Sequence, residues 1–408
     1  MPEAINQALR MRGARASHFT QPIGSIALTL TLAGCATSGG APAPTAAPQA
    51  HLGPSLAGQS VYVTVSLGTG ERNDGLTLAL NAQTGALRWK TDTGGTGGTP
   101  AVAGGVVYLA AEDGSIRALD AATGKQRWSF TRTVGISAQS GYDGYAAVNG
   151  VTVYITSDGG ALYALDVATG KQRWVATWPS SGDTIYAPPT VDGGLVFVAA
   201  GGPDGGAYAL DATTGKTVWK AARPQGFNAR PVVAGGVLYF VSQTADTLVA
   251  LDEKTGATRW STGSSAITSP PVAGDGVVFV SGADAIIRAF HTQDGAPAWT
   301  FQTGGSAATP IFATGAAMTL DGPTLYAGSQ GGVVYALDAT TGRQHWSANA
   351  NSPVDSAPAV ADGAVFVTTE SGKVMVFGAS DGAPAWTYAA GASALITSGP
   401  VVAPASGS

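Results

Sequence analysis

The stretch IRALDAATGKQRW, residues 116–128, decides the fold because the chain repeats it. Close copies lie at 162–174, 207–219, 248–260 and 334–346, and weaker copies lie at 76–89, 287–299 and 375–386. The copies end on tryptophans spaced by 39 to 47 residues: Trp89, Trp128, Trp174, Trp219, Trp260, Trp299, Trp346 and Trp386. Strand-rich repeats of about 40 to 50 residues are typical of β-propellers, with one blade to a copy.

Each copy combines apolar, β-rich stretches with turn residues such as GG, DG and TG, which indicate hairpins. An Asp opens the last turn and can accept hydrogen bonds from amides two or three residues on, while the turn Gly supplies a positive φ. These aspartates are Asp120, Asp166, Asp211, Asp252 and Asp338. Copies one, six and eight carry Asn81, His291 and Gly378 instead, so we expect looser turns there without a change of fold. We expect each final Trp ring to bury against the neighbouring blade, with its indole N–H on a partner there.

These repeats closely resemble the tryptophan-docking repeats of the PQQ-binding-like eight-bladed β-propellers, over about residues 54–403. The resemblance implies an all-β fold, an eight-bladed β-propeller of four-stranded antiparallel blades. We place the propeller at residues 52–403 and a tail at 404–408. Nine inner-strand signatures compete for eight blades, and either 54–57 or 399–403 is surplus. We expect the C-terminal segment to complete the blade built from 61–89, because joining the first and last blades covers sheet edges.

Residues 1–34 have the layout of a lipoprotein signal peptide, with Met1 or Met11 as the start. A basic region precedes an apolar run at 23–34, which is too short to span a bilayer. The residues LAGC at 32–35 resemble the lipobox of bacterial lipoproteins, and the resemblance implies cleavage before Cys35 and lipidation of that cysteine. An ordinary signal peptide with a chance cysteine is the alternative.

Residues 35–51 are the lipidated cysteine and a flexible tether of Pro, Ala, Gly, Ser and Thr. Ala36 stands where lipoproteins retained in the inner membrane usually show Asp. The resemblance therefore implies a lipid anchor in the outer membrane, on its periplasmic side, in a bacterial cell envelope.

Composition excludes several classes of protein. Charged residues make up only 12% of the chain, whereas 44% of it is hydrophobic, so the chain can bury a large core. The net charge of −5 and the lack of a basic run exclude a basic nucleic-acid-binding protein. The single cysteine excludes an internal disulfide.

An enzyme is the class that must be weighed against a scaffold, because pyrroloquinoline quinone dehydrogenases share this propeller. They resemble one another in a vicinal cysteine pair beside the quinone and in calcium ligands on long insertions, and this sequence has neither. The histidines, His18, His51, His291 and His345, lack metal-ligand spacing. Asp-Gly pairs such as 113–114 read as hairpin turns rather than calcium loops. We therefore expect no catalytic residue, no metal and no cofactor, PQQ included.

Copy lengths point to a candidate interaction face. The face formed by outer-to-inner connections gains length at 66–75, 129–144 and 175–186, and a further insertion at 314–323 is expected on the opposite face. Aromatic side chains and arginine in loops on a rigid scaffold are typical of binding hot spots, and packing of the long loops is the alternative. The candidate residues are Tyr142, Asp143, Tyr145, Trp178, Asp183, Tyr186, Phe227, Asn228 and Arg230.

Two functions follow from these observations. The first is a non-catalytic, monomeric, lipid-anchored scaffold for protein–protein interaction. Lipobox, tether and repeats resemble the BamB-type lipoproteins, which bind the barrel-forming subunit of the outer-membrane protein assembly machinery, and the resemblance implies a role in that assembly. The alternative is a small-ligand binder or PQQ-type oxidoreductase, with its site at the channel mouth formed by Tyr145, Tyr186, Asn228 and Arg230. Neither function involves a nucleic acid.

Overall fold

The regular secondary structure of the described chain is almost entirely β-strand. The computed structural model describes residues 50–405 apart from 51, 68–74, 95–97, 112, 134–144, 158–159, 179–184, 186, 202–204, 223–228, 243–245, 264–266, 305–316 and 392–393. The expected signal peptide, Cys35 and most of the tether lie outside these residues. Within them, the strands form seven four-stranded sheets and one five-stranded sheet, all antiparallel. The strand-rich repeats thus form eight blades, as the sequence predicts.

The blades follow one another along the chain, and in blades 2 to 8 the first strand is innermost, whereas the last strands of the chain take that place in blade 1. Blade 1 contains β33 (Val401–Pro404), β32 (Leu395–Ile396), β1 (Gln59–Ser66), β2 (Gly75–Asn81) and β3 (Leu87–Asp92). Blade 2 contains β4 (Ala101–Ala103), β5 (Val106–Ala110), β6 (Ser115–Asp120) and β7 (Gln126–Thr131). Blade 3 contains β8 (Ala146–Asn149), β9 (Thr152–Ser157), β10 (Ala161–Asp166) and β11 (Gln172–Thr177). Blades 4 and 5 contain β12 (Thr190–Asp192), β13 (Leu195–Ala200), β14 (Gly206–Asp211) and β15 (Thr217–Ala222); and β16 (Val232–Ala234), β17 (Val237–Ser242), β18 (Thr247–Asp252) and β19 (Thr258–Gly263). Blades 6 to 8 contain β20 (Val272–Gly274), β21 (Val277–Ser281), β22 (Ile286–His291) and β23 (Pro297–Gln302); β24 (Ala317–Asp321), β25 (Thr324–Gly328), β26 (Val333–Asp338) and β27 (Gln344–Asn349); and β28 (Ala359–Ala361), β29 (Ala364–Thr369), β30 (Lys373–Gly378) and β31 (Pro384–Ala389).

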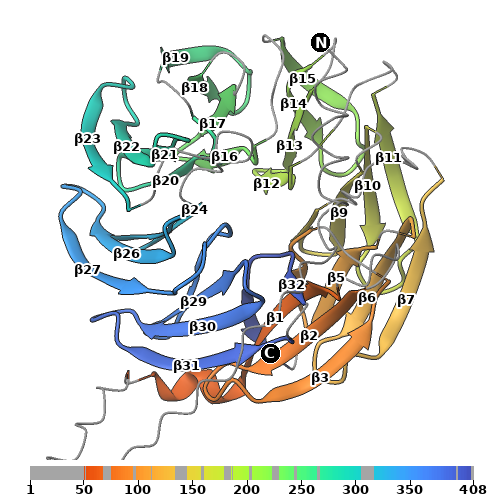
Figure 1. Ribbon diagram of the computed structural model, residues 1–408. Helices are drawn as coiled ribbons and strands as arrows, with labels where there is room; N and C mark the ends of the chain where they lie inside the picture. The colour runs from red at the N-terminus through yellow and green to blue at the C-terminus, as the bar shows by residue number, and fades with distance from the viewer. Residues whose placement is uncertain are drawn as a thin grey trace, which may run out of the picture. The chain divides into compact units, whose positions relative to one another are not determined.

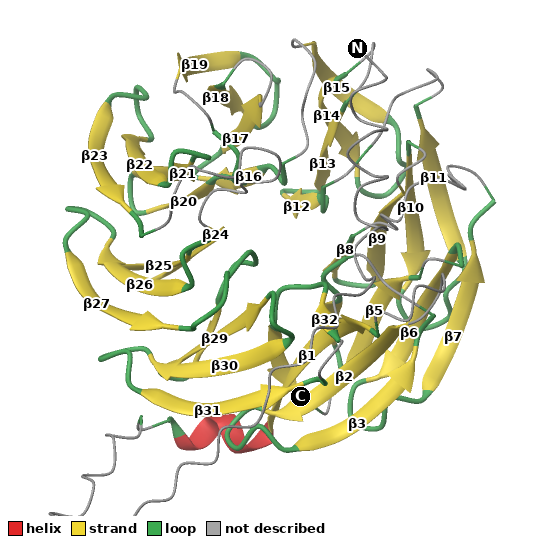
Figure 2. Cartoon of the chain, in the orientation of Figure 1, coloured by secondary structure: helices red, strands yellow, loops and turns green. Residues whose placement is uncertain are grey.

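The innermost strands form a closed ring. Contacts run from β4 through β8, β12, β16, β20, β24 and β28 to β33, and from β33 back to β4. Figure 1 shows the sheets around this ring, with β7, β11, β23, β27 and β31 on the outer rim. Figure 2 shows strands in every blade and a short helix beside β31 and β3. This element is the 3₁₀-helix η2 (Pro54–Gly58).

The C-terminal segment closes the ring, as expected from the sequence. Strand β33 pairs with one end of β1, so that Val402 lies opposite Val61, and β32 pairs with the other end, where Leu395 lies opposite Ser66. The surplus signature at 54–57 forms η2 instead of a strand. The last strands of the chain therefore cover the inner edge of β1.

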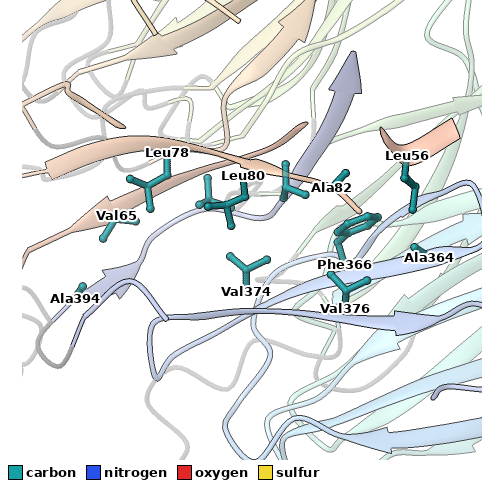
Figure 3. Close-up of a cluster of buried hydrophobic side chains, with 12 residues drawn as sticks. Leu56, Val65, Leu78, Leu80, Ala82, Ala364, Phe366, Val374, Val376 and Ala394 are labelled. Carbon is teal, nitrogen blue, oxygen red and sulfur yellow. The ribbon is translucent and has the colours of Figure 1, made fainter. Parts of the chain in front are cut away.

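The apolar core is divided among the seams between blades. Each of the eight pairs of neighbouring blades contributes one cluster of buried apolar side chains. Figure 3 shows the cluster between blades 1 and 8, where Leu78 and Leu80 of β2 face Val374 and Val376 of β30. Leu56 of η2 is fully buried in the same seam. Burying such a side chain contributes about 1.5–3 kcal/mol, so each seam stabilises the ring.

The repeat tryptophans lie on the turn of the following blade. Trp89 Nε1 donates to Ala121 O at 2.9 Å, and a Cβ atom added at Gly124 would lie 2.6 Å from Cε3 of the same ring. The remaining tryptophans dock in the same way, at 2.9–3.1 Å: Trp128 on Val167 O, Trp174 on Ala212 O, Trp219 on Glu253 O, Trp260 on Thr292 O, Trp299 on Ala339 O, Trp346 on Ala379 O and Trp386 on Ala82 O. Trp386 of blade 8 docks on blade 1, so the same contact is present where the last blade meets the first.

A second aromatic donor shares the carbonyl that each tryptophan uses in five of the blades. Tyr62 Oη donates to Ala121 O at 3.1 Å, beside the Trp89 indole. Burial raises the pKa of these tyrosines, so the hydroxyls stay protonated as donors at neutral pH. The five are Tyr62, Tyr108, Tyr154, Tyr239 and Tyr326. Blades 4, 6 and 8 place Phe197, Phe279 and Phe366 against their tryptophans.

The turn before each tryptophan has the expected geometry. Asp120 Oδ1 accepts from the amides of Ala122 at 3.1 Å and Thr123 at 2.9 Å, and Gly124 has φ +70°. The expected looseness of the first turn is wrong, because Asn81 Oδ1 accepts from the amides of residues 83 and 84 at 2.9 Å and so replaces the carboxylate.

Blades 6 and 8 keep the backbone bond that closes the turn. Gly295 N donates to His291 O, and Gly382 N donates to Gly378 O, both at 2.9 Å. Asp294 and Asp381, which replace the turn Thr, each accept one amide. The fold of these turns is therefore unchanged by the substitutions.

Candidate functional site

Antiparallel strands divide the connections between two faces of the propeller. On the loop face, fourth strands end, the first strands of the next blades begin, and second strands turn into third strands. Described residues of the loop face include Thr99, Tyr145, Pro188, Arg230, Asp355 and Glu370. On the turn face lie the turns between strands one and two and between strands three and four, including Asp120, Gly124 and Asp362. Of the candidate interaction residues, Tyr145, Trp178 and Arg230 are described, and they lie on the loop face.

The expected insertion at 314–323 is misplaced. Strand β23 ends at Gln302 and β24 begins at Ala317, so the extra length lies between a fourth strand and the next first strand. Residues 322–323 form an ordinary turn between β24 and β25. The ends of this long connection are therefore on the loop face, with the other insertions, and not on the opposite face.

Tyr145 is fixed through its backbone at the start of blade 3. Its amide donates to Thr156 Oγ1 at 3.2 Å, and its carbonyl accepts from Thr156 N at 3.1 Å. The Thr156 hydroxyl also lies 3.3 Å from Ala187 O, beside blade 4. Tyr145 is therefore held where two inner strands meet, and its residue is half-buried.

Trp178 packs within a seam. Its ring meets the ring of Tyr208 edge to face, with centroids 5.4 Å apart, and its amide donates to Gly160 O at 2.9 Å. Two other seams contain the same kind of pair, Phe130 with Tyr163 and Phe301 with Tyr335. The packing alternative considered for the loop aromatics therefore describes the contacts of Trp178.

Arg230 lies just before β16, the innermost strand of blade 5. Its Nε lies 3.4 Å from Thr190 Oγ1 on β12, the innermost strand of blade 4. The residue is exposed to solvent, yet surrounding protein lowers the pKa of the guanidinium through burial. The other candidates, Tyr142, Asp143, Asp183, Tyr186, Phe227 and Asn228, lie outside the described residues.

A carboxyl pair on the loop face was missed by the sequence analysis. Asp355 precedes blade 8, and Glu370 lies in the turn between β29 and β30. Burial, and then hydrogen bonding and repulsion from Glu370, raise the pKa of Asp355 to about 7, although Gln330 Nε2 donates to its carboxyl group. Fifteen residues separate the two acids in the sequence, and the antiparallel pairing of β28 with β29 brings them together at one end of blade 8.

Within the part of the chain that the structure describes, no three His, Cys, Asp or Glu side chains gather to hold a metal ion. Among the same residues, no helix has the length and apolar character to cross a membrane.

Fold and docking geometry define an eight-bladed, tryptophan-docked β-propeller. A family model described as outer membrane protein assembly factor BamB matches residues 36–201, 137–226, 203–332 and 309–407. Because these matches span the whole propeller, the chain belongs to this family.

Known relatives share the repeat and the fold. The outer membrane protein assembly factor BamB of Yersinia pestis is 39% identical over 70 residues, which are 17% of this chain and only 18% of that relative. The structure of BamB from Moraxella catarrhalis is similar with a TM-score of 0.60 at 22% identity, covering 80% of this chain and 93% of that one. The quinohemoprotein alcohol dehydrogenase ADHIIG of Pseudomonas putida HK5 is similar with a TM-score of 0.57 at 17% identity, covering 72% and 66%. At these identities the structural likenesses show the fold alone.

Proposed function

We propose that the protein is a non-catalytic, lipid-anchored scaffold of the bacterial cell envelope that binds a protein partner in outer-membrane protein assembly. The observation that carries the proposal is the family match over the whole propeller. The fold alone does not select this role, because eight-bladed propellers also serve quinohemoprotein dehydrogenases. The partner would be a component of the barrel assembly machinery.

The attachment of the N-terminal segment supports an orientation for this scaffold. Ala50 N donates to Pro384 O at 3.3 Å, and Gly53 N donates to Asp362 O at 3.2 Å. Arg88 Nη2 donates to Ala57 O at 3.0 Å, which ties the segment to blade 1 as well. Asp362 and Pro384 flank turns of the turn face, so the segment joins the propeller on that side.

A tether from a lipidated Cys35 would therefore hold the propeller by its turn face and leave the loop face to the partner. Fifteen residues extend to at most about 50 Å, which sets the largest distance between the anchor and residue 50. We place the anchor in the outer membrane, with the propeller in the periplasm as a monomer. Stable anchoring needs more than one acyl chain, and a triacylated Cys35 would supply them.

The second candidate, a PQQ-dependent or other ligand-binding propeller, is favoured by the likeness to the quinohemoprotein alcohol dehydrogenase. With one cysteine in the whole sequence, the chain cannot form the vicinal pair that the resemblance would require. We therefore propose no bound quinone, no metal and no catalysis.

The test is a mild-detergent pull-down of the full lipidated protein from crosslinked envelopes, with Cys35→Ser as the matched control and identification by mass spectrometry. The proposal expects a barrel-assembly component retained by the lipidated protein and depleted in the control. Recovery of nothing above the control would contradict it. Melting of the same protein with PQQ and Ca²⁺ separates the candidates, because a rise in Tm would favour the quinone-binding alternative.

A further inference from the structure

Arg230 is the charged member of a ring of equivalent positions at the inner rim of the loop face. In each blade, one residue of the first strand pairs with the aromatic residue that contacts the docking tryptophan, and the ring position lies two residues before it. In blade 5, Val232 pairs with Tyr239, which places Arg230 in the ring. The other blades carry uncharged residues there: Thr99, Tyr145, Pro188, Pro270, Ala317, Ala357 and Gly399.

The side chain of Arg230 is oriented through one atom. Its Nε lies 3.4 Å from Thr190 Oγ1, and the Thr190 hydroxyl itself donates to Pro231 O. Arg230 therefore spans the seam between the inner strands of blades 4 and 5. Its terminal amino groups make no hydrogen bond or ion pair to the residues that the structure describes.

The other loop-face arginines that are described have acceptors for their terminal groups. Arg117 pairs with Asp113, and Arg288 pairs with Asp284, each four residues away on the same hairpin. Arg132 is buried, and its Nη1 donates to a serine hydroxyl at 3.1 Å while its Nη2 donates to a backbone carbonyl at 3.3 Å. Arg230 differs from all three because its fork of N–H donors is left open.

The electrostatic surroundings agree with this geometry. Burial is the cause that lowers the pKa of Arg230, and no carboxylate among the described residues acts against it. The guanidinium stays charged at neutral pH, so it is a partly desolvated cation without a counter-ion in the described chain. An anion placed on its open side would restore the interactions that the protein removes.

We propose that Arg230 receives a carboxylate group of the protein partner at the inner rim of the loop face. This inference rests on the proposed function. The two terminal amino groups form a planar fork that matches a carboxylate with two parallel hydrogen bonds. Thr190 engages only Nε, so both terminal amino groups are left for this carboxylate. An acidic side chain or the C-terminal carboxylate of the partner fits this fork.

The experiment compares Arg230→Gln and Arg230→Lys with the wild type and with Arg288→Gln, all as full lipidated chains in crosslinked envelopes. Arg288→Gln is the matched control, because it removes a guanidinium from the same face that Asp284 already engages. Partner yield is measured by quantitative mass spectrometry over a series of bait concentrations, and Tm is measured for every variant. We expect Arg230→Gln to weaken capture about 30-fold, with wild-type Tm and unchanged capture by the control. Arg230→Lys keeps the charge and loses the fork, so a loss of about 10-fold is expected.

Capture by Arg230→Gln at the wild-type level would overturn the inference and leave the scaffold function standing. Failure of the wild type itself to capture a partner would instead overturn the proposed function, and the inference with it. A free organic acid is the other source of a carboxylate, so melting is repeated in citrate and in succinate. If either acid raises the Tm of the wild type but not of Arg230→Gln, while capture is the same for both, the site binds a small acid and the partner assignment is wrong.

Discussion

Gly124 offers a direct test of the docking geometry. It has φ +70°, and an added Cβ would lie 2.6 Å from Cε3 of Trp89 and 2.6 Å from Oγ1 of Thr91. Gly104, in the same blade, has φ +56°, and its added Cβ would meet nothing within 4 Å. Replacing each glycine by alanine therefore imposes similar backbone strain, while only Gly124→Ala also displaces the docked ring.

The two substitutions should differ by the cost of overpacking. A left-handed conformation costs a non-glycine residue about 1–2 kcal/mol, and both variants carry this cost. Forcing a methyl group into a packed site adds about 1–3 kcal/mol. We expect a loss of about 1–2 kcal/mol for Gly104→Ala and about 2–5 kcal/mol for Gly124→Ala. For a domain of about 350 residues, the entropy of unfolding is such that each 1 kcal/mol of lost stability lowers Tm by about 1.4 °C. The Tm values of the two variants should therefore differ by about 1–4 °C.

The assay is thermal and urea unfolding of the two full-length variants beside the wild type, followed by tryptophan fluorescence and circular dichroism. Equal losses in Gly104→Ala and Gly124→Ala would refute the reasoning, because backbone strain would then account for the whole effect. A larger loss in Gly104→Ala would show that the ring over Gly124 tolerates the methyl group.

Three further predictions concern single side chains. Tyr108→Phe should lower the free energy of unfolding by no more than about 1 kcal/mol, because the shared carbonyl keeps its hydrogen bond from the Trp128 indole. Trp128→Phe should lower it by about 2–4 kcal/mol. Urea unfolding of both variants checks this order, and a reversed order would contradict the shared-acceptor geometry. The hydrogen bond from Arg259 and the turn contacts lower the pKa of Asp252 to about 2. The stabilisation by this carboxylate is therefore present above about pH 4 and is lost as the pH falls from 4 to 2. Over this window, the Tm of Asp252→Asn should fall less than the Tm of the wild type. The pKa of Asp355 is raised to about 7, so between about pH 4 and pH 7 the folded state binds more protons than the unfolded state. Stability should therefore decline from about pH 4 to pH 7. Asp355→Asn should reduce this decline, and a profile of Tm against pH identical to that of the wild type would count against the carboxyl pair.

The fold was predictable because its determinants are local and repeated. The residues from Asp120 to Gly124 determine the geometry of their own turn, and Trp128 follows at a fixed distance. The same pattern recurs at the length of one blade, which strengthens the prediction of a propeller. The closure followed from counting inner-strand signatures and from the cost of open edges. Asn81 was misjudged because the amide oxygen of Asn accepts the same two backbone amides as a carboxylate.

The candidate site was predictable only in part, because its geometry depends on how separate connections meet. The sequence analysis placed the insertion before blade 7 on the wrong face because it took the first strand of that blade to end before residue 314, whereas the strand begins at Ala317. The composition of a loop does not determine where its side chains point, so the sequence did not predict that Trp178 packs on Tyr208. Asp355 and Glu370 meet through the antiparallel register of β28 and β29, which the sequence analysis did not fix.

The division between the two faces accounts for how one ring can serve different tasks. Every docked tryptophan uses a turn of the turn face, so an inserted residue between Asp120 and Gly124 would remove the surface on which Trp89 lies. The connection from β7 to β8 is long, yet Trp128 still docks on the turn after Asp166. Length on the loop face thus leaves the docking contacts intact, whereas length on the turn face does not. Functional differences among propellers of this kind are therefore expected on the loop face, and Arg230 lies at the inner rim of that face.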